Sequence, residues 1–101
     1  MKNFRCYQMA KTQYLACQKL KLPRYLKDQL DRASLSICLN LAEGSGKSSR
    51  KERRRFYEIA LASHRETQAI LDLMQQQKLA READTLGGSL FCLVRKLECG
   101  G

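Results

Sequence analysis

The segment between Pro23 and Gly44 carries apolar residues at steps of three and four positions, and this spacing constrains the fold more than any other feature of the chain. Residues at such steps share one face of an α-helix, which has 3.6 residues per turn. Residues 35–41 also alternate between apolar and polar side chains, as a strand would. No other part of the chain shows a convincing strand pattern, so the helix is the better interpretation. The residues on the apolar face are Leu26, Leu30, Ala33, Ile37 and Leu41.

A second row of apolar residues lies on the opposite side of this predicted helix and explains the apparent alternation. It consists of Leu35, Leu39 and Ala42. A helix that is apolar on two sides must be covered on both. The second cover is either another subunit or a further part of the same chain, and the sequence leaves both possibilities open. If another subunit covers it, Leu35, Leu39 and Ala42 form an oligomer interface.

Helix-forming residues dominate the rest of the chain, and glycine and proline interrupt them only sparsely. We therefore expect an all-α fold. With 101 residues, the chain forms one domain (1–101) that is large enough to bury a core without metals or disulfides. The helices are expected at about residues 3–21, 23–43, 49–76 and 79–98.

Two features of the last two predicted helices concern their packing. The expected inward residues of the third helix follow a three- and four-residue spacing. Gly87 and Gly88 interrupt the fourth, but the leucine spacing continues through them, so we expect them to admit a neighbouring helix. The expected inward residues of the third helix are Phe56, Ile59, Ala60, Ser63, Thr67, Ile70, Leu71 and Met74.

The connection between the second and third helices is expected to be a tight turn over residues 44–48. Gly44 stands where a helix would end in a left-handed residue, and Ser49 with Glu52 fits the capping box that begins the next helix. The alternative is a phosphate-binding loop ending in Gly46, Lys47 and Ser48. The first glycine of that motif is replaced by Leu41, and the surrounding strands are missing. If the loop did hydrolyse nucleotides, Lys47→Ala would abolish affinity for ATP or GTP.

Positive charge dominates the composition and concentrates at the start of the third helix. The chain has 19 basic and 10 acidic residues, for a net charge of +9, and six of the nine residues at 47–55 are basic. Such a cluster favours contact with nucleic-acid phosphates and little sequence preference. The alternative is a solvated helix start whose arginines pair with nearby carboxylates such as Glu58. The predicted binding residues are Lys47, Arg50, Lys51, Arg54 and Arg55, with Arg65 continuing their face.

Other functional classes find little support. The five cysteines lack C-x-x-C spacing and His64 is the only histidine, so we expect no metal and no cofactor. His64 and Ser63 are adjacent on a helix and cannot act as nucleophile and base, so we expect no enzyme. No segment resembles a secretory signal or a membrane span, and we expect a cytoplasmic protein. Asn40, Glu43 and Glu66 are better explained as polar residues that fix helix packing.

Four stretches together resemble a known family. They are residues 34–37, 40–48, 56–60 and 63–66, which read SLSI, NLAEGSGKS, FYEIA and SHRE. They are similar to the proteins encoded within intervening sequences of bacterial 23S ribosomal RNA genes. Within the pattern, Leu41 replaces isoleucine, Lys47 replaces arginine and Ala62 replaces glycine. The structural motif comprises Asn40, Glu43, Gly44, Gly46, Ser49, Glu52 and Glu66.

The resemblance implies a fold and an assembly but no catalytic residues. It implies an antiparallel up-down-up-down four-helix bundle that assembles into a homopentamer. It also implies kinship with the accessory variability determinants of diversity-generating retroelements, which bind nucleic acid and a reverse transcriptase. The leading hypothesis is therefore a non-enzymatic, oligomeric protein that binds RNA or DNA. Its rival is a protein-interaction scaffold, such as a reverse-transcriptase accessory factor.

Overall fold

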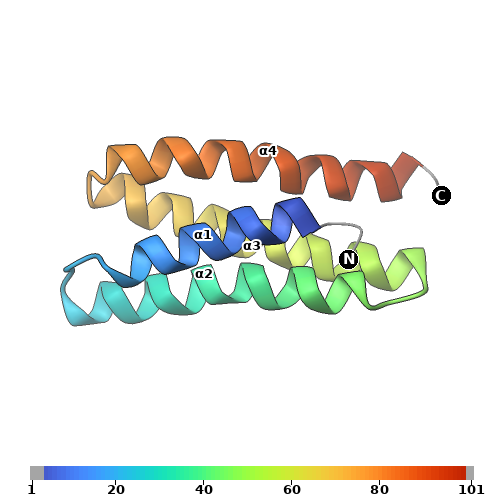
Figure 1. Cartoon of the computed structure of the whole chain (residues 1–101), viewed down its shortest axis with the longest axis horizontal. Helices are drawn as coiled ribbons and strands as arrows, with labels where there is room; N and C mark the ends of the chain where they lie inside the picture. The colour runs from blue at the N-terminus through green and yellow to red at the C-terminus, as the bar shows by residue number, and fades with distance from the viewer. Residues whose placement is uncertain (1–3, 100–101) are drawn as a thin grey trace.

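The protein is a bundle of four helices. The computed structural model describes residues 4–99, and these contain four α-helices and no strand. Consecutive helices run in opposite directions (Figure 1), which makes the bundle antiparallel. The all-α prediction is confirmed, and residues 35–41 lie inside a helix. The helices are α1 (Phe4–Gln18), α2 (Arg24–Ser45), α3 (Arg50–Leu73) and α4 (Gln77–Cys99).

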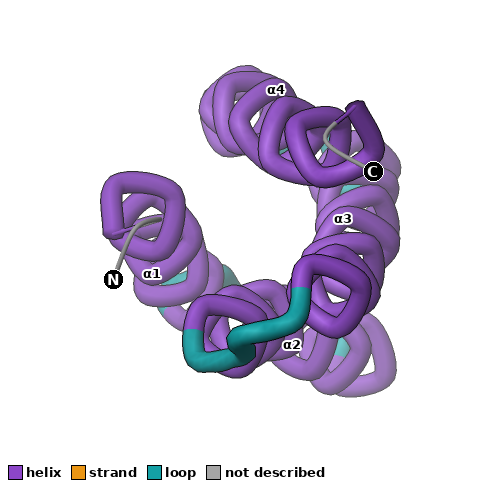
Figure 2. The backbone as a smooth tube through the Cα atoms, turned by 90° about the vertical axis from the view of Figure 1, so that its right-hand side faces the viewer, coloured by secondary structure: helices purple, strands orange, loops and turns teal. Residues whose placement is uncertain are grey.

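Each helix packs against two others. Contacts join α1 to α2, α2 to α3, α3 to α4 and α4 to α1, and the last pair has the sparsest contacts. Viewed from the end, the helices follow one another around the bundle, and the gap between α1 and α4 is wider than that between the other neighbouring pairs (Figure 2). Grooves of about 440 Å³ and 560 Å³ lie between these two helices. The helix pairs α2–α3 and α3–α4 therefore form the best-packed part of the fold.

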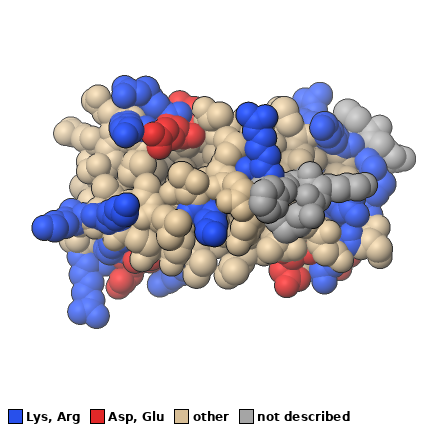
Figure 3. Space-filling model, in the orientation of Figure 1, with Lys and Arg blue, Asp and Glu red and all other residues tan. Residues whose placement is uncertain are grey.

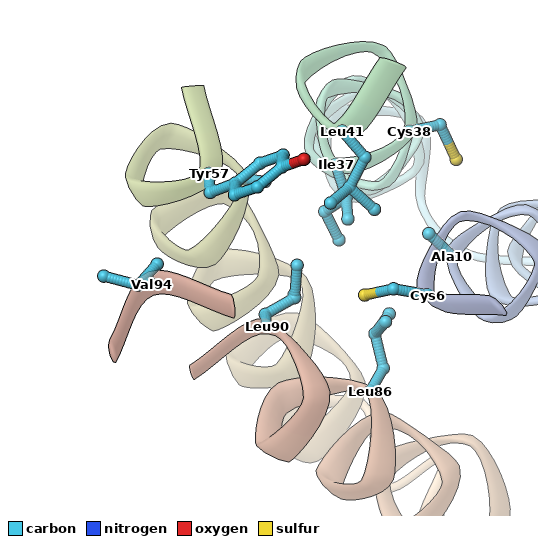
Figure 4. Close-up of a cluster of buried hydrophobic side chains, with 10 residues drawn as sticks. Cys6, Ala10, Ile37, Cys38, Leu41, Tyr57, Leu86, Leu90 and Val94 are labelled. Atoms are coloured by element: carbon cyan, nitrogen blue, oxygen red, sulfur yellow. The ribbon is translucent and has the colours of Figure 1, made fainter. Parts of the chain in front are cut away.

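The core consists of two clusters of buried side chains. The larger cluster draws residues from all four helices (Figure 4), and Tyr57 reaches within it from α3 toward Ile37 and Leu41 of α2. The smaller cluster includes Cys17, Leu30, Ile70, Leu71 and Ala83. Leu20 and Leu22, from the α1–α2 connection, pack against this second cluster. Burial of these apolar surfaces is the main driving force for folding.

The helix ends differ from the predicted ones by a few residues. The first helix ends at Gln18 rather than residue 21, because Lys27 Nζ donates hydrogen bonds to the carbonyl oxygens of Cys17 and Gln18, at 2.8 and 3.1 Å. The second extends to Ser45 instead of residue 43. The fourth begins at Gln77, two residues earlier than predicted, and ends at Cys99. The predicted start at residue 3 lies outside the described residues.

The third helix ends at Leu73, not residue 76. It ends in a backbone motif that could not be recognised from the sequence, because no glycine marks it. Gln75 adopts a left-handed conformation with φ of 57°. Its N–H donates to the carbonyl of Asp72 at 3.0 Å, and the N–H of Gln76 donates to the carbonyl of Leu71 at 2.9 Å. This pair of hydrogen bonds defines a Schellman motif, in which the left-handed residue is usually glycine.

The inward face of α3 differs from the predicted face over residues 56–64. Tyr57 and His64 are buried, whereas the sequence pattern assigned Phe56, Ile59 and Ser63 to the core. Ile59 is 38% exposed, and Phe56 and Ser63 are half-buried. Helical spacing defines which residues share a face, but a tyrosine and a histidine do not identify themselves as core residues. Ala60, Thr67, Ile70 and Leu71 are buried as predicted.

Two glycines allow close helix contacts. Gly44 lies within α2 and is not left-handed, because no described glycine has a positive φ. A Cβ atom at Gly44 would meet the Tyr57 ring at 2.6 Å, so lack of a side chain is what the fold requires there. A Cβ at Gly87 would similarly meet His64 Nε2 at 2.6 Å. The prediction that α4 continues through Gly87 and Gly88 is confirmed. The predicted close approach of a neighbouring helix is found at Gly87, whereas a Cβ at Gly88 would meet no atom within 4 Å.

Candidate nucleic-acid interface

The basic cluster begins within the short connection between α2 and α3 and continues into the first turns of α3. Gly46 ends α2 in a right-handed conformation, and its N–H donates to the carbonyl of Glu43 at 3.1 Å. Ser49 precedes α3, and its hydroxyl accepts a hydrogen bond from the N–H of Glu52 at 3.3 Å. The predicted cap at Ser49 is confirmed. The Glu52 carboxylate instead accepts from Arg55 Nε at 2.9 Å, so the reciprocal half of a capping box is not formed.

Polar side chains on α2 fix its position against α3 in a way the sequence only partly indicated. Asn40 Nδ2 donates to the carbonyl and hydroxyl oxygens of Ser36, at 2.8 and 3.0 Å. The Ser36 hydroxyl in turn lies 2.8 Å from the hydroxyl of Ser63 on α3. Among the described residues, no hydrogen bond or ion pair joins Asn40 to Glu43 or Glu66, which are both exposed. The serine pair, not Asn40 with the two glutamates, therefore links the helices.

Arg50 and Arg54 connect the start of α3 to the end of α4. Arg50 Nη2 donates to the carbonyl oxygens of Lys96 and Leu97, at 2.9 and 3.4 Å. These carbonyls belong to the last turn of α4, where a cation is favoured by the helix dipole. Arg54 pairs with Glu58 at 2.6 Å and with Glu98 at 3.2 Å. Both arginines therefore have a structural role besides their charge.

The remaining cations of the cluster surround the α2–α3 connection. Arg53 Nη2 donates to the carbonyl of Lys47 at 2.8 Å, which braces the loop. Lys47 Nζ lies 3.7 Å from a Glu43 carboxylate oxygen. Lys47 and Arg55 also lie over the Phe56 ring, at 5.3 and 4.7 Å from its centroid. Such contacts hold cations at the surface without removing their charge.

The cluster keeps a positive balance despite these ion pairs. Its six basic residues face four carboxylates, those of Glu43, Glu52, Glu58 and Glu98. The hydrogen bond from Arg55 lowers the pKa of Glu52, so this carboxylate stays ionised. Among the described residues, Lys51 has no recorded hydrogen bond or ion pair. Water screens surface ion pairs of this kind, so they contribute little to stability and a phosphate can replace a carboxylate partner at little cost.

Arg65 is exposed but lies apart from the rest of the cluster. It follows Arg55 by ten residues, a distance of about 15 Å along the helix. It lines a groove of about 620 Å³ at the α3–α4 side together with Asp72, Arg81 and Asp84. A ligand must extend along α3 to reach both Arg55 and Arg65. The predicted face is therefore formed by two separate groups of cations.

The predicted oligomer residues are exposed, and α3 extends the apolar surface that they form. Leu35 and Leu39 are 39% and 56% exposed, and Ala42 is also exposed. Ile59 on the adjacent face of α3 is 38% exposed. We group these exposed residues of the two neighbouring helices as the α2–α3 apolar face. No part of the described chain covers them fully.

Sequence reasoning missed the residues of α4 that contact the cluster. Glu98 and the carbonyls of Lys96 and Leu97 lie more than 40 residues after Arg50 in the chain. Backbone carbonyls carry no sequence signal, so only the fold reveals the Arg50 contact. Glu98 offered a weak signal, because an antiparallel fourth helix returns to the end of the molecule where α3 begins.

The described residues hold no group of three or more His, Cys, Asp or Glu side chains arranged for a metal ion. Within the same part of the chain, no helix combines the length and the apolar character that a membrane span requires. The segment before Gly46, Lys47 and Ser48 is helical, so the strand that normally leads into a nucleotide-binding phosphate loop is not found there.

Comparison with known proteins places the chain in a family. Searches of curated proteins and of solved structures found no match. The family model for the 23S rRNA-intervening sequence protein matches residues 2–90. This span includes α1, α2, α3 and more than half of α4. The chain therefore belongs to the family of 23S rRNA-intervening sequence proteins.

Proposed function

We propose that this family member is a non-enzymatic, cytoplasmic protein that binds RNA or DNA through the cluster at residues 47–55. The observation that carries the proposal is the concentration of six basic side chains at an exposed end of the molecule. Figure 3 shows Lys and Arg side chains gathered toward both ends of the long axis in this view. Contacts to phosphate dominate the affinity of such surfaces for nucleic acid.

Within the cluster, Lys51 and Arg55 are the residues best suited to phosphate. Both are exposed, and neither forms a hydrogen bond or ion pair with the described residues of α4. Lys47 and Arg54 would contribute by exchanging carboxylate for phosphate, while Arg50 maintains its contact with the end of α4. Tyr57 is only 1% exposed and cannot stack on a base, which favours binding through the backbone with little sequence preference.

We also propose that the protein self-associates through the α2–α3 apolar face, as a homopentamer if it follows the assembly that the family resemblance implies. The exposed apolar side chains of Leu35, Leu39 and Ile59 support this proposal. The same face favours the rival function, an interaction scaffold for a partner such as a reverse transcriptase. In the scaffold, the positive charge of the basic cluster would dock an acidic partner or a ribonucleoprotein instead of free nucleic acid.

A double charge reversal, Lys51→Glu with Arg55→Glu, tests the nucleic-acid proposal. We expect wild-type protein to bind unrelated RNA and DNA duplexes at about 50 mM salt, with affinity that falls steeply as salt rises. The variant should bind more weakly and show a shallower salt dependence, by about one unit of slope for each lost phosphate contact. Fluorescence anisotropy of labelled duplexes measures both quantities.

The matched control is Lys11→Glu, which makes the same change at an exposed position of α1. The control should reduce affinity only slightly, because it lies outside the cluster. The proposal fails if wild-type protein does not bind at about 50 mM salt, where phosphate contacts are strongly favoured. The double variant changes two lysine or arginine residues and the control changes one. The proposal also fails if the loss of binding free energy per substituted residue is the same in both. If the double variant still bound nucleic acid but no longer captured a reverse transcriptase, the result would favour the interaction scaffold.

A further inference from the structure

A second exposed basic surface lies at the opposite end of the molecule, in the connection between α1 and α2. Here lysine and leucine alternate over residues 19–22, and Pro23 precedes α2. Leu20 and Leu22 pack against the smaller core cluster, while Lys19 and Lys21 are exposed. The leucines anchor the backbone of the connection to the bundle. The lysines are therefore presented outward from a segment that is held in place.

The cations of this surface are not neutralised by nearby carboxylates. Lys19, Lys21 and Arg24 are exposed, and none of them has an ion pair within the described residues. Asp31, a nearby acid of α2, is already engaged by Lys27 Nζ at 3.0 Å and by Gln18 Nε2 at 2.9 Å. Asp28 lies one turn after Arg24 but forms no ion pair with it. In the cluster at residues 47–55, by comparison, carboxylates pair with several of the cations.

An exposed aromatic residue directly follows the last of these cations in the chain. Tyr25 follows Arg24 directly and is 71% exposed, whereas Tyr57 is buried and Tyr7 and Tyr14 are half-buried. The contact between Ser36 and Ser63 sets the antiparallel register of α2 and α3, which places Tyr25 level with the end of α3. There Leu73 is 73% exposed. A ring with this exposure offers a flat apolar surface to a ligand.

We propose that Lys19, Lys21, Arg24 and Tyr25 form a binding surface for unpaired nucleic-acid bases. Tyr25 stacks against a base, and the three cations bind the phosphates on either side. This combination of a positively charged surface and an aromatic platform is how proteins bind single strands without reading sequence. Basic side chains project from the end where the α1–α2 connection lies (Figures 1 and 3). The surface is separate from the α3 cluster and does not depend on it.

The test uses the full chain and labelled oligouridylate and oligothymidylate, with a duplex of matched length for comparison. Tyr25→Ala should weaken binding of both single strands by about tenfold, which is within the range found for loss of one stacked base. Tyr25→Phe keeps the ring and should bind as wild type does. Duplex binding should be unchanged in both variants, because a paired base is not free to stack on Tyr25.

Charge and assembly provide the remaining controls. Lys19→Glu with Lys21→Glu should weaken single-strand binding and reduce its salt dependence. The proposal is overturned if Tyr25→Ala binds single strands as tightly as wild type does, or loses duplex and single-strand affinity equally. It is also overturned if Tyr25→Ala alters the native mass, which would assign Tyr25 to a subunit contact. The outcome is also separable from that of the cluster at residues 47–55. If Tyr25 still contributes to single-strand affinity in the Lys51→Glu, Arg55→Glu variant, the proposal is supported, even if the protein does not bind duplexes.

Discussion

Gly87 determines how closely α4 approaches α3. The Cβ that an alanine would add lies 2.6 Å from Nε2 of His64, a ring that is only 2% exposed and has little room to move. A Cβ added at Gly88, the next residue, would meet no neighbouring atom within 4 Å. Two adjacent glycines in one helix therefore have different roles, and they form a matched pair for experiment.

We expect Gly87→Ala to lower the free energy of unfolding by about 1–2 kcal/mol, because over-packing costs more than alanine gains as a helix former. Gly88→Ala should raise it by about 0.5–1 kcal/mol, since only the helix preference changes. Urea denaturation of both variants measures the difference. Equal effects at the two positions would show that helix propensity, and not the contact with His64, determines the outcome.

His64 couples the stability of the bundle to pH. Burial lowers the pKa of His64 below its ordinary value of 6.5, and the positive charge of Arg65 acts in the same direction. Gln68 and Asp84 favour the protonated form but do not outweigh burial. The unfolded chain therefore binds a proton at a higher pH than the folded chain does. The contribution of neutral His64 to stability is therefore present above pH 6.5 and is lost as the pH falls below that value.

We expect urea denaturation at pH 5.5 to give a lower free energy of unfolding than at pH 7.0. His64 is the only histidine in the chain, and histidine is the side chain whose ordinary pKa lies in this pH window. His64→Gln should remove most of the difference between the two pH values, even if it lowers stability at both. A variant that retains the full difference would assign the pH dependence to other groups.

At the scale of the helices, the end of α3 shows a local strain that can be relieved. Gln75 is the only described residue other than glycine with a positive φ, and it closes a Schellman motif. A left-handed conformation costs a residue with a side chain about 1–2 kcal/mol, a cost that glycine does not have. The hydrogen bonds of Asp72 and Leu71 with the turn hold Gln75 in place despite this cost.

Gln75→Gly is expected to raise the free energy of unfolding by about 1 kcal/mol, because it removes this strain at the cost of a more flexible unfolded chain. Gln76→Gly is the control, since Gln76 has no positive φ and gains nothing from glycine. Thermal or urea denaturation gives the comparison. A decrease in stability for both variants would show that the Gln75 side chain contributes more than the strain costs.

Helix type and most connections could be predicted from the sequence because their signals are local. The spacing of Leu26, Leu30 and Ile37 identified α2, and Ser49 identified the start of α3. The end of α3 could not be located as well, because glutamine is an uncommon residue at a left-handed helix end. The role of Gly44 was misassigned for a related reason: a glycine can serve either a turn or a close contact, and the local sequence does not distinguish them.

At the scale of the whole molecule, the proposed self-association predicts a native mass several times the 11.6 kDa of one chain. Leu39→Lys with Ile59→Lys should lower that mass toward 11.6 kDa, because lysines on the α2–α3 apolar face oppose its burial. Leu15→Lys, on α1, is the control and should leave the mass unchanged. Light scattering after size-exclusion chromatography measures all three. A monomeric wild-type protein would refute the self-association.

The position of the basic cluster could be predicted from the sequence, but its contacts with α4 could not. Its position at the start of α3 and its exposed residues Lys51 and Arg55 followed from charge and helical spacing. Its contacts with α4 did not, because Arg50 and Arg54 meet groups that are more than 40 residues away in the chain. Half-exposed Arg54 pairs with two carboxylates. A count of charges in the sequence does not show which arginines are paired in this way.

Local information was sufficient for the four helices, the Ser49 cap and the positive charge, because each depends on residues within a few positions of one another. The folded arrangement was needed to identify which residues at 56–64 of α3 are buried, the close contacts of Gly44 and Gly87 and the exposure of Tyr25. One residue along a helix turns the side chain by about 100°, so the face that becomes buried depends on which neighbour packs against it. That neighbour is distant in the chain, and no local pattern of residues specifies it.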